Sequence, residues 1–379
     1  MGKVTWRFAS VLLMFYALTM PLPPPDPFLR LRARGADTNM SGRFEPYARE
    51  VAGDGWDMPE DDRLLRTEVT EERPRSVISR NTSPDIPFDR SLNPYRGCEH
   101  GCIYCFARPT HAYLGLSPGL DFETRLTAKP DAPEVLEREL GKRGYRPDVL
   151  AIGTNTDPYQ PIESRYRIMR RLLQVLSDWG HPVAIVTKGA MIERDIDILS
   201  DMARRNLVSV GISVTSLDPA LSRKLEPRAP APARRLAAMR ALAQAGIPVR
   251  AMVAPVIPVV TDREMEAILA AAAEAGARAA SWILLRLPLE VAPLFRDWLD
   301  RHEPLKSAHV MNRLREMRGG KDYDAEWGKR MKGEGLMADL IGKRFRLAAR
   351  RLGLDGTIPP LDLTQFHRPV RAGDQLSLF

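Results

Sequence analysis

Strand-like and helix-like segments alternate along the middle of the chain, and this alternation restricts the folds that the chain can adopt. Short apolar runs predict strands at 91–95, 148–153, 182–187, 207–215, 249–257 and 281–287. Amphipathic or alanine-rich segments predict helices at 134–144, 166–180, 193–206, 233–246, 261–276 and 292–300. Such alternation is typical of a parallel sheet covered by helices. The sequence therefore predicts an α/β fold.

Two of the predicted helices have recognisable ends. Gly180 is expected to end the helix at 166–180, because glycine readily adopts the left-handed conformation that follows a helix. Thr261 and Glu264 have the spacing of a capping box for the helix at 261–276.

The three cysteines of the chain, Cys98, Cys102 and Cys105, lie within eight residues in "RGCEHGCIYCFARP". A disulfide framework is disfavoured, because it requires an even number of cysteines and an oxidising compartment. A zinc site requires four ligands, and His100 or His111 would have to complete it. A [4Fe-4S] cluster has four irons, so three thiolates would leave one iron open to a further ligand. The cysteines alone leave the zinc and cluster interpretations open.

Glycine and arginine accompany these cysteines. Gly97 and Gly101 permit the positive φ values that a tight loop needs in order to aim closely spaced thiols at one centre. Arg96 and Arg108 flank the thiolates, where they either offset the charge of a cluster or are solvated surface charges.

The spacing C-x3-C-x2-C, with Tyr104 before the last cysteine, resembles the signature of the radical S-adenosylmethionine (SAM) superfamily. The stretches "SLNPYRGCEHGCIYCFARPTH" and "GTNTDPYQPIE" resemble the DNA-repair-photolyase-like group related to spore photoproduct lyase, over about residues 76–299. The resemblance implies a [4Fe-4S] cluster on the three cysteines, with SAM on the open iron. Reductive cleavage of SAM would give methionine and a 5'-deoxyadenosyl radical that abstracts hydrogen. It also implies a partial (β/α)6 TIM-type barrel, which the six predicted strand-helix units match.

In barrels of this kind, ligands bind at the C-terminal ends of the strands. The resemblance implies that the loop after the strand at 148–153 faces the methionyl amino group of SAM. A turn built from Asn, Asp and Pro is the simpler interpretation of that loop. The expected cofactor-binding residues are Tyr104, Asn155, Thr156, Asp157, Ser213, Thr215, Glu226 and Arg228. The substrate candidates are Tyr159, Gln160 and Lys188, and Lys188 would meet either the SAM carboxylate or a substrate phosphate.

The chain carries 56 Lys plus Arg against 48 Asp plus Glu, a net charge of +8, which suits a polyanionic partner. Together with the resemblance to the DNA-repair-photolyase-like group, this charge makes DNA the expected substrate. RNA, a peptide or a small molecule is the first alternative, and a zinc-stabilised nucleic-acid binding module without catalysis is the second. Spore photoproduct lyase is thought to use an additional cysteine as hydrogen donor, and this chain has none beyond the motif. We therefore do not transfer the thymine-dimer substrate.

Charge and composition divide the chain into five parts. We expect a lead-in at 40–85, the core barrel at 86–301, a basic helical extension at 302–354 and a tail at 355–379. The extension contains Lys343, Arg344, Arg346, Arg350 and Arg351. They form either a solvated helix face or a surface that contacts phosphates.

The segment 1–39 looks like a targeting signal, with Lys3 and Arg7 before an apolar run at 8–22. That run is shorter than the roughly 20 residues of a membrane span, and no A-x-A cleavage site follows it. We expect translation to begin at Met40, which makes 1–39 non-native. The scarcity of cysteine favours the cytoplasm. We expect no membrane association, and the resemblance implies an electron donor such as flavodoxin or ferredoxin.

The last five residues, "QLSLF", resemble the peptide by which bacterial DNA-repair and replication proteins bind the sliding clamp. Gln375 would fix the orientation of the peptide, while Leu376, Leu378 and Phe379 would enter an apolar groove. A C-terminal strand that packs back on the domain is the alternative.

Overall fold

A seven-stranded sheet in the order β10-β9-β8-β7-β6-β3-β2 forms the centre of the molecule. The computed structural model describes residues 34–45 and 66–370. The strands of the main sheet are β2 (Ile78–Arg80), β3 (Arg90–Leu92), β6 (Leu150–Ile152), β7 (Val183–Thr187), β8 (Val208–Ser213), β9 (Val249–Val256) and β10 (Ala279–Leu284). Six of them, β3 and β6 to β10, are parallel to one another, and β2 pairs antiparallel with β3 at one edge.

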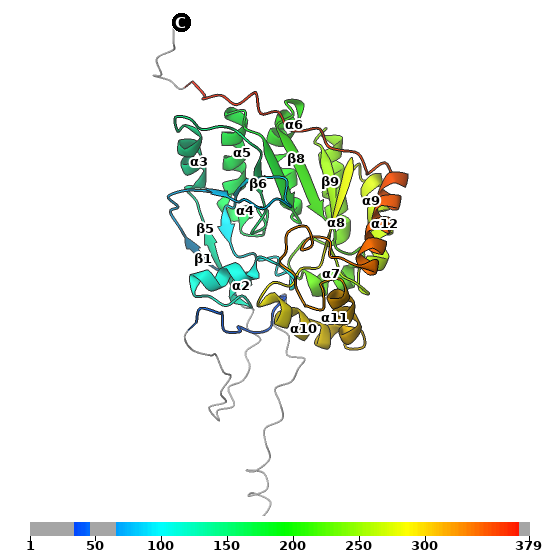
Figure 1. Ribbon diagram of the computed structural model, residues 1–379. Coiled ribbons are helices and arrows are strands. Elements are labelled where there is room, and N and C mark those ends of the chain that lie inside the picture. Colours follow the sequence, from blue (N-terminus) through cyan, green and yellow to red (C-terminus); the bar gives the residue numbers. More distant parts are fainter. Residues whose placement is uncertain (1–33, 46–65, 371–379) are drawn as a thin grey trace, which may run out of the picture.

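The sheet is curved but open (Figure 1). Among the described residues, β2 and β10 end the sheet and do not pair with each other. The predicted α/β fold with a parallel sheet is confirmed, and its shape agrees with a partial rather than a closed barrel.

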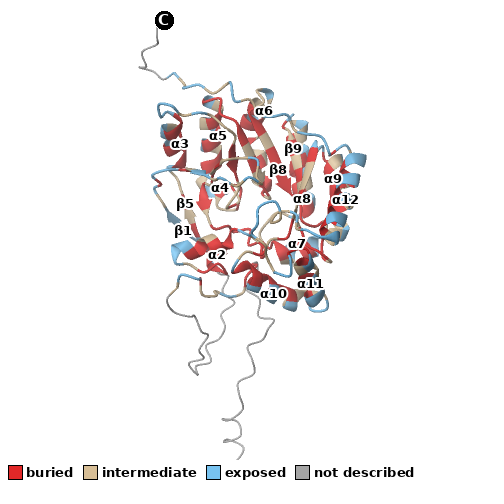
Figure 2. Ribbon diagram, viewed as in Figure 1, coloured by how far each residue is buried: buried red, intermediate tan, exposed pale blue. Residues whose placement is uncertain are grey.

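Helices alternate with the parallel strands, as predicted, and the apolar faces of five of them cover the sheet. These five are α3 (Ala132–Leu140), α5 (Ile168–Asp178), α6 (Ile196–Arg204), α8 (Pro232–Gln244) and α9 (Met265–Glu274). The sixth helix, α10 (Val291–His302), lies apart from the sheet at the bottom of Figure 1, beside the helix at 307–316. Figure 2 shows that the strands and the helix faces against them are buried, while the outer helix faces are exposed. Gly180 follows α5 with a φ of +56°, which confirms the predicted end of that helix.

A small second sheet in the order β1-β5-β4 lies beside the main one. Its strands are β1 (Glu68–Glu71), β4 (Tyr95–Arg96) and β5 (Arg125–Ala128), so the predicted lead-in contributes both β1 and β2 to sheets. The short helical elements are η1 (Arg108–Leu114), α2 (Asp121–Thr124), α4 (Glu163–Tyr166), η2 (Ala190–Asp195), α7 (Pro219–Leu225) and η3 (Asp262–Glu264).

The predicted capping box at Thr261 and Glu264 is wrong. Helix α9 begins at Met265, and no side-chain hydrogen bond caps it. The Thr261 hydroxyl instead accepts a hydrogen bond from the amide of Ile257, and the Glu264 carboxylate accepts from the amide of Leu217. The two side chains therefore bond to backbone amides that precede the helix, one of them distant in the sequence, instead of to each other's amides.

The C-terminal extension is helical and basic, as expected, with α11 (Ser307–Glu316) and α12 (Leu336–Arg351). Helix α12 packs its buried Phe345 against Trp282 of β10. Arg344 is bound by Glu266 at 2.8 Å, whereas Lys343 and Arg346 are exposed. The exposed basic residues of α12 are compatible with either expectation, a solvated helix face or a surface that contacts phosphates.

Across the described residues, no helix combines the length and the hydropathy that a membrane crossing requires. The "QLSLF" segment and the apolar run at 8–22 lie outside the described residues.

Candidate active site around three cysteines

The three cysteines lie in a loop, residues 97–107, that follows β4; we call it the cysteine loop. Gly97 and Gly101 have φ values of +74° and +66°, as predicted. A Cβ atom on Gly97 would lie 2.6 Å from the Leu126 side chain, so glycine is required there on steric grounds as well. The amide of Cys98 donates to the Phe122 carbonyl at 2.9 Å, which ties the start of the loop to α2.

The thiols of Cys98, Cys102 and Cys105 line one cavity of about 190 Å³. Its other lining residues are His100, Tyr104, Phe106, Ala107, Gly153, Thr154, Asn155, Thr156, Asp157, Val186, Thr187, Lys188, Ser213, Met252, Ala254, Pro255, Ile283, Leu284 and Arg286. Many of these residues belong to the C-terminal ends of β6, β7, β8, β9 and β10 or follow them directly. The cavity therefore occupies the position at which barrels of parallel strands bind ligands.

The loop after β6 is fastened to the cysteine loop and to β7. Thr156 donates to the Gly97 carbonyl at 2.5 Å, and the Gln160 amide group donates to both Gly97 and Thr156. The Asp157 carboxylate accepts hydrogen bonds from the Thr187 hydroxyl and from the Lys188 amide. Asp157 therefore uses its oxygens inside the protein as well as lining the cavity.

The charge of Asp157 is strongly favoured. Burial by itself raises the pKa of this carboxyl, but the adjacent His100 ring, with Nδ1 3.3 Å from the carboxylate, and the hydrogen bonds from Thr187 and Lys188 lower it to about 2. His100 belongs to the cysteine loop, so this contact is another link between the two loops.

The hydroxyl of Tyr104 belongs to a buried polar network. Its hydroxyl bonds to Thr215 at 3.1 Å and donates to Glu226, which also forms a buried ion pair with Arg235 of α8. Thr215 and Glu226 are buried behind Tyr104 and do not line the cavity. Arg228 likewise lies outside the lining and pairs with Glu99 at 3.0 Å.

Lys188 places a cation in the cavity. Its Nζ atom lies 5.7 Å from the centre of the Tyr104 ring. Burial is the largest influence and lowers the pKa of Lys188, but nearby acidic groups, among them the Glu226 carboxylate, raise it above its usual value overall. Lys188 therefore stays charged beside the thiols, where a ligand carboxylate or phosphate would be attracted.

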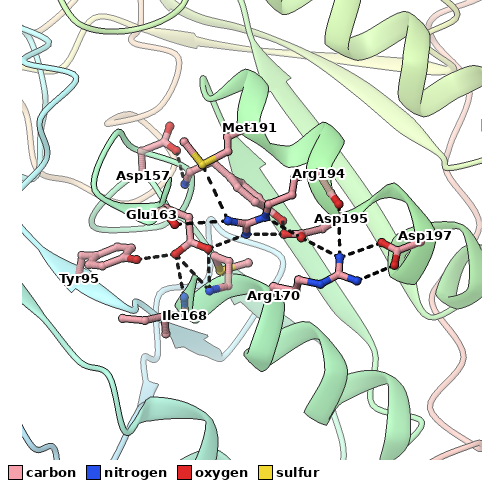
Figure 3. Close-up of polar contacts among 11 residues, drawn as sticks. Tyr95, Asp157, Glu163, Ile168, Arg170, Met191, Arg194, Asp195 and Asp197 are labelled. Atoms are coloured by element: carbon pink, nitrogen blue, oxygen red, sulfur yellow. Dashed lines mark hydrogen bonds and ion pairs between the residues drawn. The ribbon is translucent and has the colours of Figure 1, made fainter. Parts of the chain in front are cut away.

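Tyr159 and Gln160 are buried and do not line the cavity. The Tyr159 hydroxyl donates to buried Asp195, which pairs with Arg170 and Arg194 (Figure 3). Glu163 joins this network through Arg194. This network ties the segment after β6 to Asp195 and Arg194.

The donor set fits an iron-sulfur cluster better than a zinc ion. Within residues 34–45 and 66–370, no three His, Cys, Asp or Glu side chains are grouped closely enough to hold one ion. His111 is directed elsewhere, since its Nε2 bonds to the Arg125 carbonyl at 2.9 Å. Three thiols in one cavity with a cation nearby suit a larger anionic group held by three thiolates.

Two of the metal-free thiols, those of Cys98 and Cys102, are held in their neutral form. Burial raises the pKa of Cys98 well above its usual value and that of Cys102 to about 12. Metal binding therefore has to displace these protons, which makes binding depend on pH.

Sequence reasoning missed Phe106 and Arg286 at the mouth of the cavity. The Arg286 guanidinium lies 4.9 Å from the centre of the Phe106 ring, and it donates to the Tyr323 hydroxyl at 3.2 Å. Its buried Nε atom has no hydrogen-bond partner among the described residues. Arg286 lies at the end of a predicted strand, so the strand-end rule that selected Lys188 was also a signal for Arg286.

The fold and this site define an α/β protein with a cavity at the C-terminal ends of its parallel strands, lined by the three cysteines. The family model of the radical SAM superfamily matches residues 92–272. An uncharacterized protein of Mycobacterium tuberculosis is 40% identical over 234 residues, which are 61% of this chain and 68% of the relative. The chain belongs to the radical SAM superfamily, and membership implies a [4Fe-4S] cluster and SAM.

Relatives and solved structures extend this result. An uncharacterized protein of Methanocaldococcus jannaschii is 25% identical over 173 residues, covering 46% of this chain and 62% of the relative. Spore photoproduct lyase, solved in complex with the dinucleoside spore photoproduct, has a TM-score of 0.52 and 15% identity, covering 75% of this chain and 79% of the lyase. At that identity the likeness establishes the fold.

Proposed function

We propose that the cavity binds a [4Fe-4S] cluster through Cys98, Cys102 and Cys105, with SAM beside it. The observation that carries the proposal is that three thiols of one loop line a single cavity at the C-terminal ends of the strands. When bound, the cluster supplies the electron that cleaves SAM to methionine and a 5'-deoxyadenosyl radical, which abstracts a hydrogen atom from the substrate. The apolar walls, among them Val186, Met252 and Ile283, exclude water from this chemistry.

The polar lining residues bind SAM in this proposal. Lys188 binds the SAM carboxylate, because it is a charged group inside the cavity. Asn155 and Ser213 supply polar groups for the methionyl and ribose parts, while the Thr156 hydroxyl lines the cavity but already bonds to Gly97 and Gln160. Asp157 contributes mainly by holding the loop after β6, since its oxygens already accept hydrogen bonds.

Three of the expected cofactor-binding residues act indirectly. Thr215 and Glu226 fix the Tyr104 hydroxyl, and Tyr104 presents its ring to the cavity. Arg228 fixes Glu99 of the cysteine loop. Tyr159 and Gln160, proposed as substrate contacts, fit better as supports of the loop.

DNA is the substrate that we propose, in a reaction related to those of repair lyases. The net charge of +8 suits a polyanion. Phe106, which is 46% exposed, and Arg286 offer a base a stacking surface and a phosphate a positive charge at the cavity mouth. The product radical has to regain hydrogen from a group other than a further cysteine, since all three cysteines of the chain belong to the motif.

The test is anaerobic reconstitution followed by reduction with dithionite. Iron and sulfide near about four per chain, with cleavage of SAM, support the proposal. Stoichiometric zinc without cleavage supports the zinc-stabilised binding module instead. Deuterated DNA, RNA, peptide and small-molecule candidates then identify the substrate, because only the true substrate transfers deuterium into 5'-deoxyadenosine.

The partners and the cellular location belong to the same proposal. A cytoplasmic flavodoxin or ferredoxin supplies the electron, and the tail residues Gln375, Leu376, Leu378 and Phe379 bind the sliding clamp. Clamp binding would raise the effective concentration of the enzyme on DNA. A titration of the clamp with the full chain and with a chain ending at Asp374 tests this. Equal binding by both, or by neither, contradicts it.

A further inference from the structure

Residues 34–45, called here the N-terminal strap, lie alongside α2 and the segment before it (Figure 1, dark blue beside cyan). Asn39 and Asp121 exchange two hydrogen bonds of 2.9 Å. The Ser117 hydroxyl donates to the Met40 carbonyl at 2.6 Å. Ala36 is buried to 1% exposure, so the strap is part of the core rather than a surface appendage.

Glu123 of α2 binds the strap through its backbone. Its carboxylate is completely buried and accepts hydrogen bonds from the amides of Gly35 and Ala36, one on each oxygen and each at 2.9 Å. The Glu123 carbonyl also accepts from Arg34 at 2.8 Å. A buried carboxylate is stable only when its oxygens are satisfied in this way.

Arg108 joins the same carboxylate to the cysteine loop. Its guanidinium is completely buried and pairs with Glu123. It donates to the Cys102 carbonyl at 3.0 Å, the Gly101 carbonyl at 3.3 Å and the Gly119 carbonyl at 2.9 Å. Arg108 is thus a structural cation inside the protein, and the interpretation of this residue as a solvated surface charge is wrong.

The strap also contacts the cysteine loop directly. A Cβ atom on Gly35 would lie 1.9 Å from the Gly101 carbonyl oxygen, so the two backbones approach more closely than any side chain permits. The strap, α2 and the cysteine loop therefore meet at Glu123 and Arg108.

We infer that Glu123 is a positioning residue for the cysteine loop and that strap residues 34–39 are part of the structure that holds the cluster ligands. Through Arg108, Glu123 fixes the backbone on both sides of Cys102. The inference rests on the proposed function, in that the loop has to bind the cluster.

The inference opposes the expectation that the protein begins at Met40. A chain that starts there lacks Gly35 and Ala36, which leaves both oxygens of Glu123 short of a donor and exposes the inner face of the cysteine loop. Residues 34–39 are therefore expected in the active protein.

Glu123→Gln tests the inference, because glutamine keeps the shape but turns an NH2 group toward a backbone amide or toward Arg108. We expect about 10- to 100-fold faster loss of the cluster and an altered electron paramagnetic resonance signal of the reduced cluster with SAM. In the metal-free protein we expect faster alkylation of the three thiols. Gly35→Ala and a chain starting at Met40 should act in the same direction.

Glu139→Gln is the matched control. Glu139 of α3 also accepts hydrogen bonds from two backbone amides, those of Val77 and Ile78, at 2.9 and 3.1 Å, but it does not contact the cysteine loop. This variant should lower the melting temperature and leave the cluster signal and the thiol reactivity unchanged.

Each outcome decides between the alternatives. Wild-type cluster stability, signal and thiol reactivity in Glu123→Gln and in the Met40 chain would overturn the inference and leave the proposed function intact. An equal change in Glu139→Gln would overturn it too, since the effect would then be general destabilisation. If the wild-type protein binds no cluster, the proposed function fails, and the alkylation rates alone still decide whether Glu123 and the strap position the loop.

Discussion

The hydroxyl of Thr156 donates a hydrogen bond of 2.5 Å to the backbone carbonyl of Gly97. This bond joins the loop after β6 to the cysteine loop, so one contact couples a candidate SAM-binding segment to the candidate cluster ligands. The Gly97 carbonyl has a second donor, the Gln160 amide group, at 3.3 Å.

Thr156→Val removes the shorter of these two bonds without changing the size of the side chain. We expect a loss of about 1 kcal/mol in the free energy of unfolding. We also expect weaker SAM binding, because this hydrogen bond no longer fixes the position of one loop relative to the other. Urea unfolding and equilibrium SAM binding measure the two effects. Ser164→Ala removes an exposed hydroxyl bond to the Pro161 carbonyl and should change neither; equal effects in both variants would contradict the coupling.

Cys102→Ala removes a thiolate that no other cysteine of the chain can replace, since the cysteines number three. The cluster should be lost or badly depleted after reconstitution, and reductive SAM cleavage should disappear with it. Iron and sulfide analysis together with 5'-deoxyadenosine detection give the answer. Full iron content with undiminished cleavage would contradict the proposal that Cys102 is one of three cluster ligands.

Lys188→Met replaces the cation of the cavity with an apolar side chain of similar length. If Lys188 binds the SAM carboxylate, the lost charge-assisted hydrogen bond should weaken SAM binding about 10- to 100-fold. Lys343→Met, on the exposed face of α12, is the control and should leave SAM binding unchanged. Unaltered SAM binding with a raised KM for nucleic acid would instead assign Lys188 to the substrate phosphate.

The buried His181 makes stability depend on pH. Burial lowers the pKa of His181 from 6.5 to about 4, while its ring contacts the Tyr145 hydroxyl and the Pro182 carbonyl. The unfolded chain therefore takes up the proton first as the pH falls. This contribution is fully present above about pH 6.5 and is lost toward pH 4, with a total of about 3 kcal/mol.

His181→Asn should flatten this part of the curve of unfolding free energy against pH. Urea unfolding between pH 4 and 7 measures it, with the exposed His309→Asn as control. A slope that His181→Asn leaves unchanged would show that other groups carry the pH dependence.

Much of the fold was predictable, because the spacing of apolar residues indicates whether a segment is a strand or a helix and which of its faces is buried. The run "VAIVT" became β7, and the apolar face of α5 lies against the sheet as its spacing indicated. The capping box failed because Glu264 serves Leu217, 47 residues away in the sequence. Local patterns do not record such distant partners.

The site was predictable to the same extent. Cys98, Asn155 and Lys188 line the cavity because strand ends converge there, which the alternation of elements implies. Glu226 was expected to bind the cofactor, but its carboxylate forms a buried ion pair with Arg235 of α8 and does not line the cavity. The sequence does not show this pairing, because the two residues belong to different elements. The role of residues 34–39 was missed, since an extended segment without apolar periodicity looks dispensable until its backbone partners are known.

The loop between α11 and α12 contacts several separate parts of the protein. Arg330 pairs with Asp85, Arg318 donates to the Leu285 carbonyl, and Tyr323 meets Arg286 at the cavity mouth. One of these partners, Arg286, also lies 4.9 Å from the centre of the Phe106 ring in the cysteine loop. A substitution in the loop between α11 and α12 that displaces Arg286 would therefore also change the surroundings of Phe106, so the cavity lining depends on a segment that lies more than 200 residues from the cysteines in the sequence.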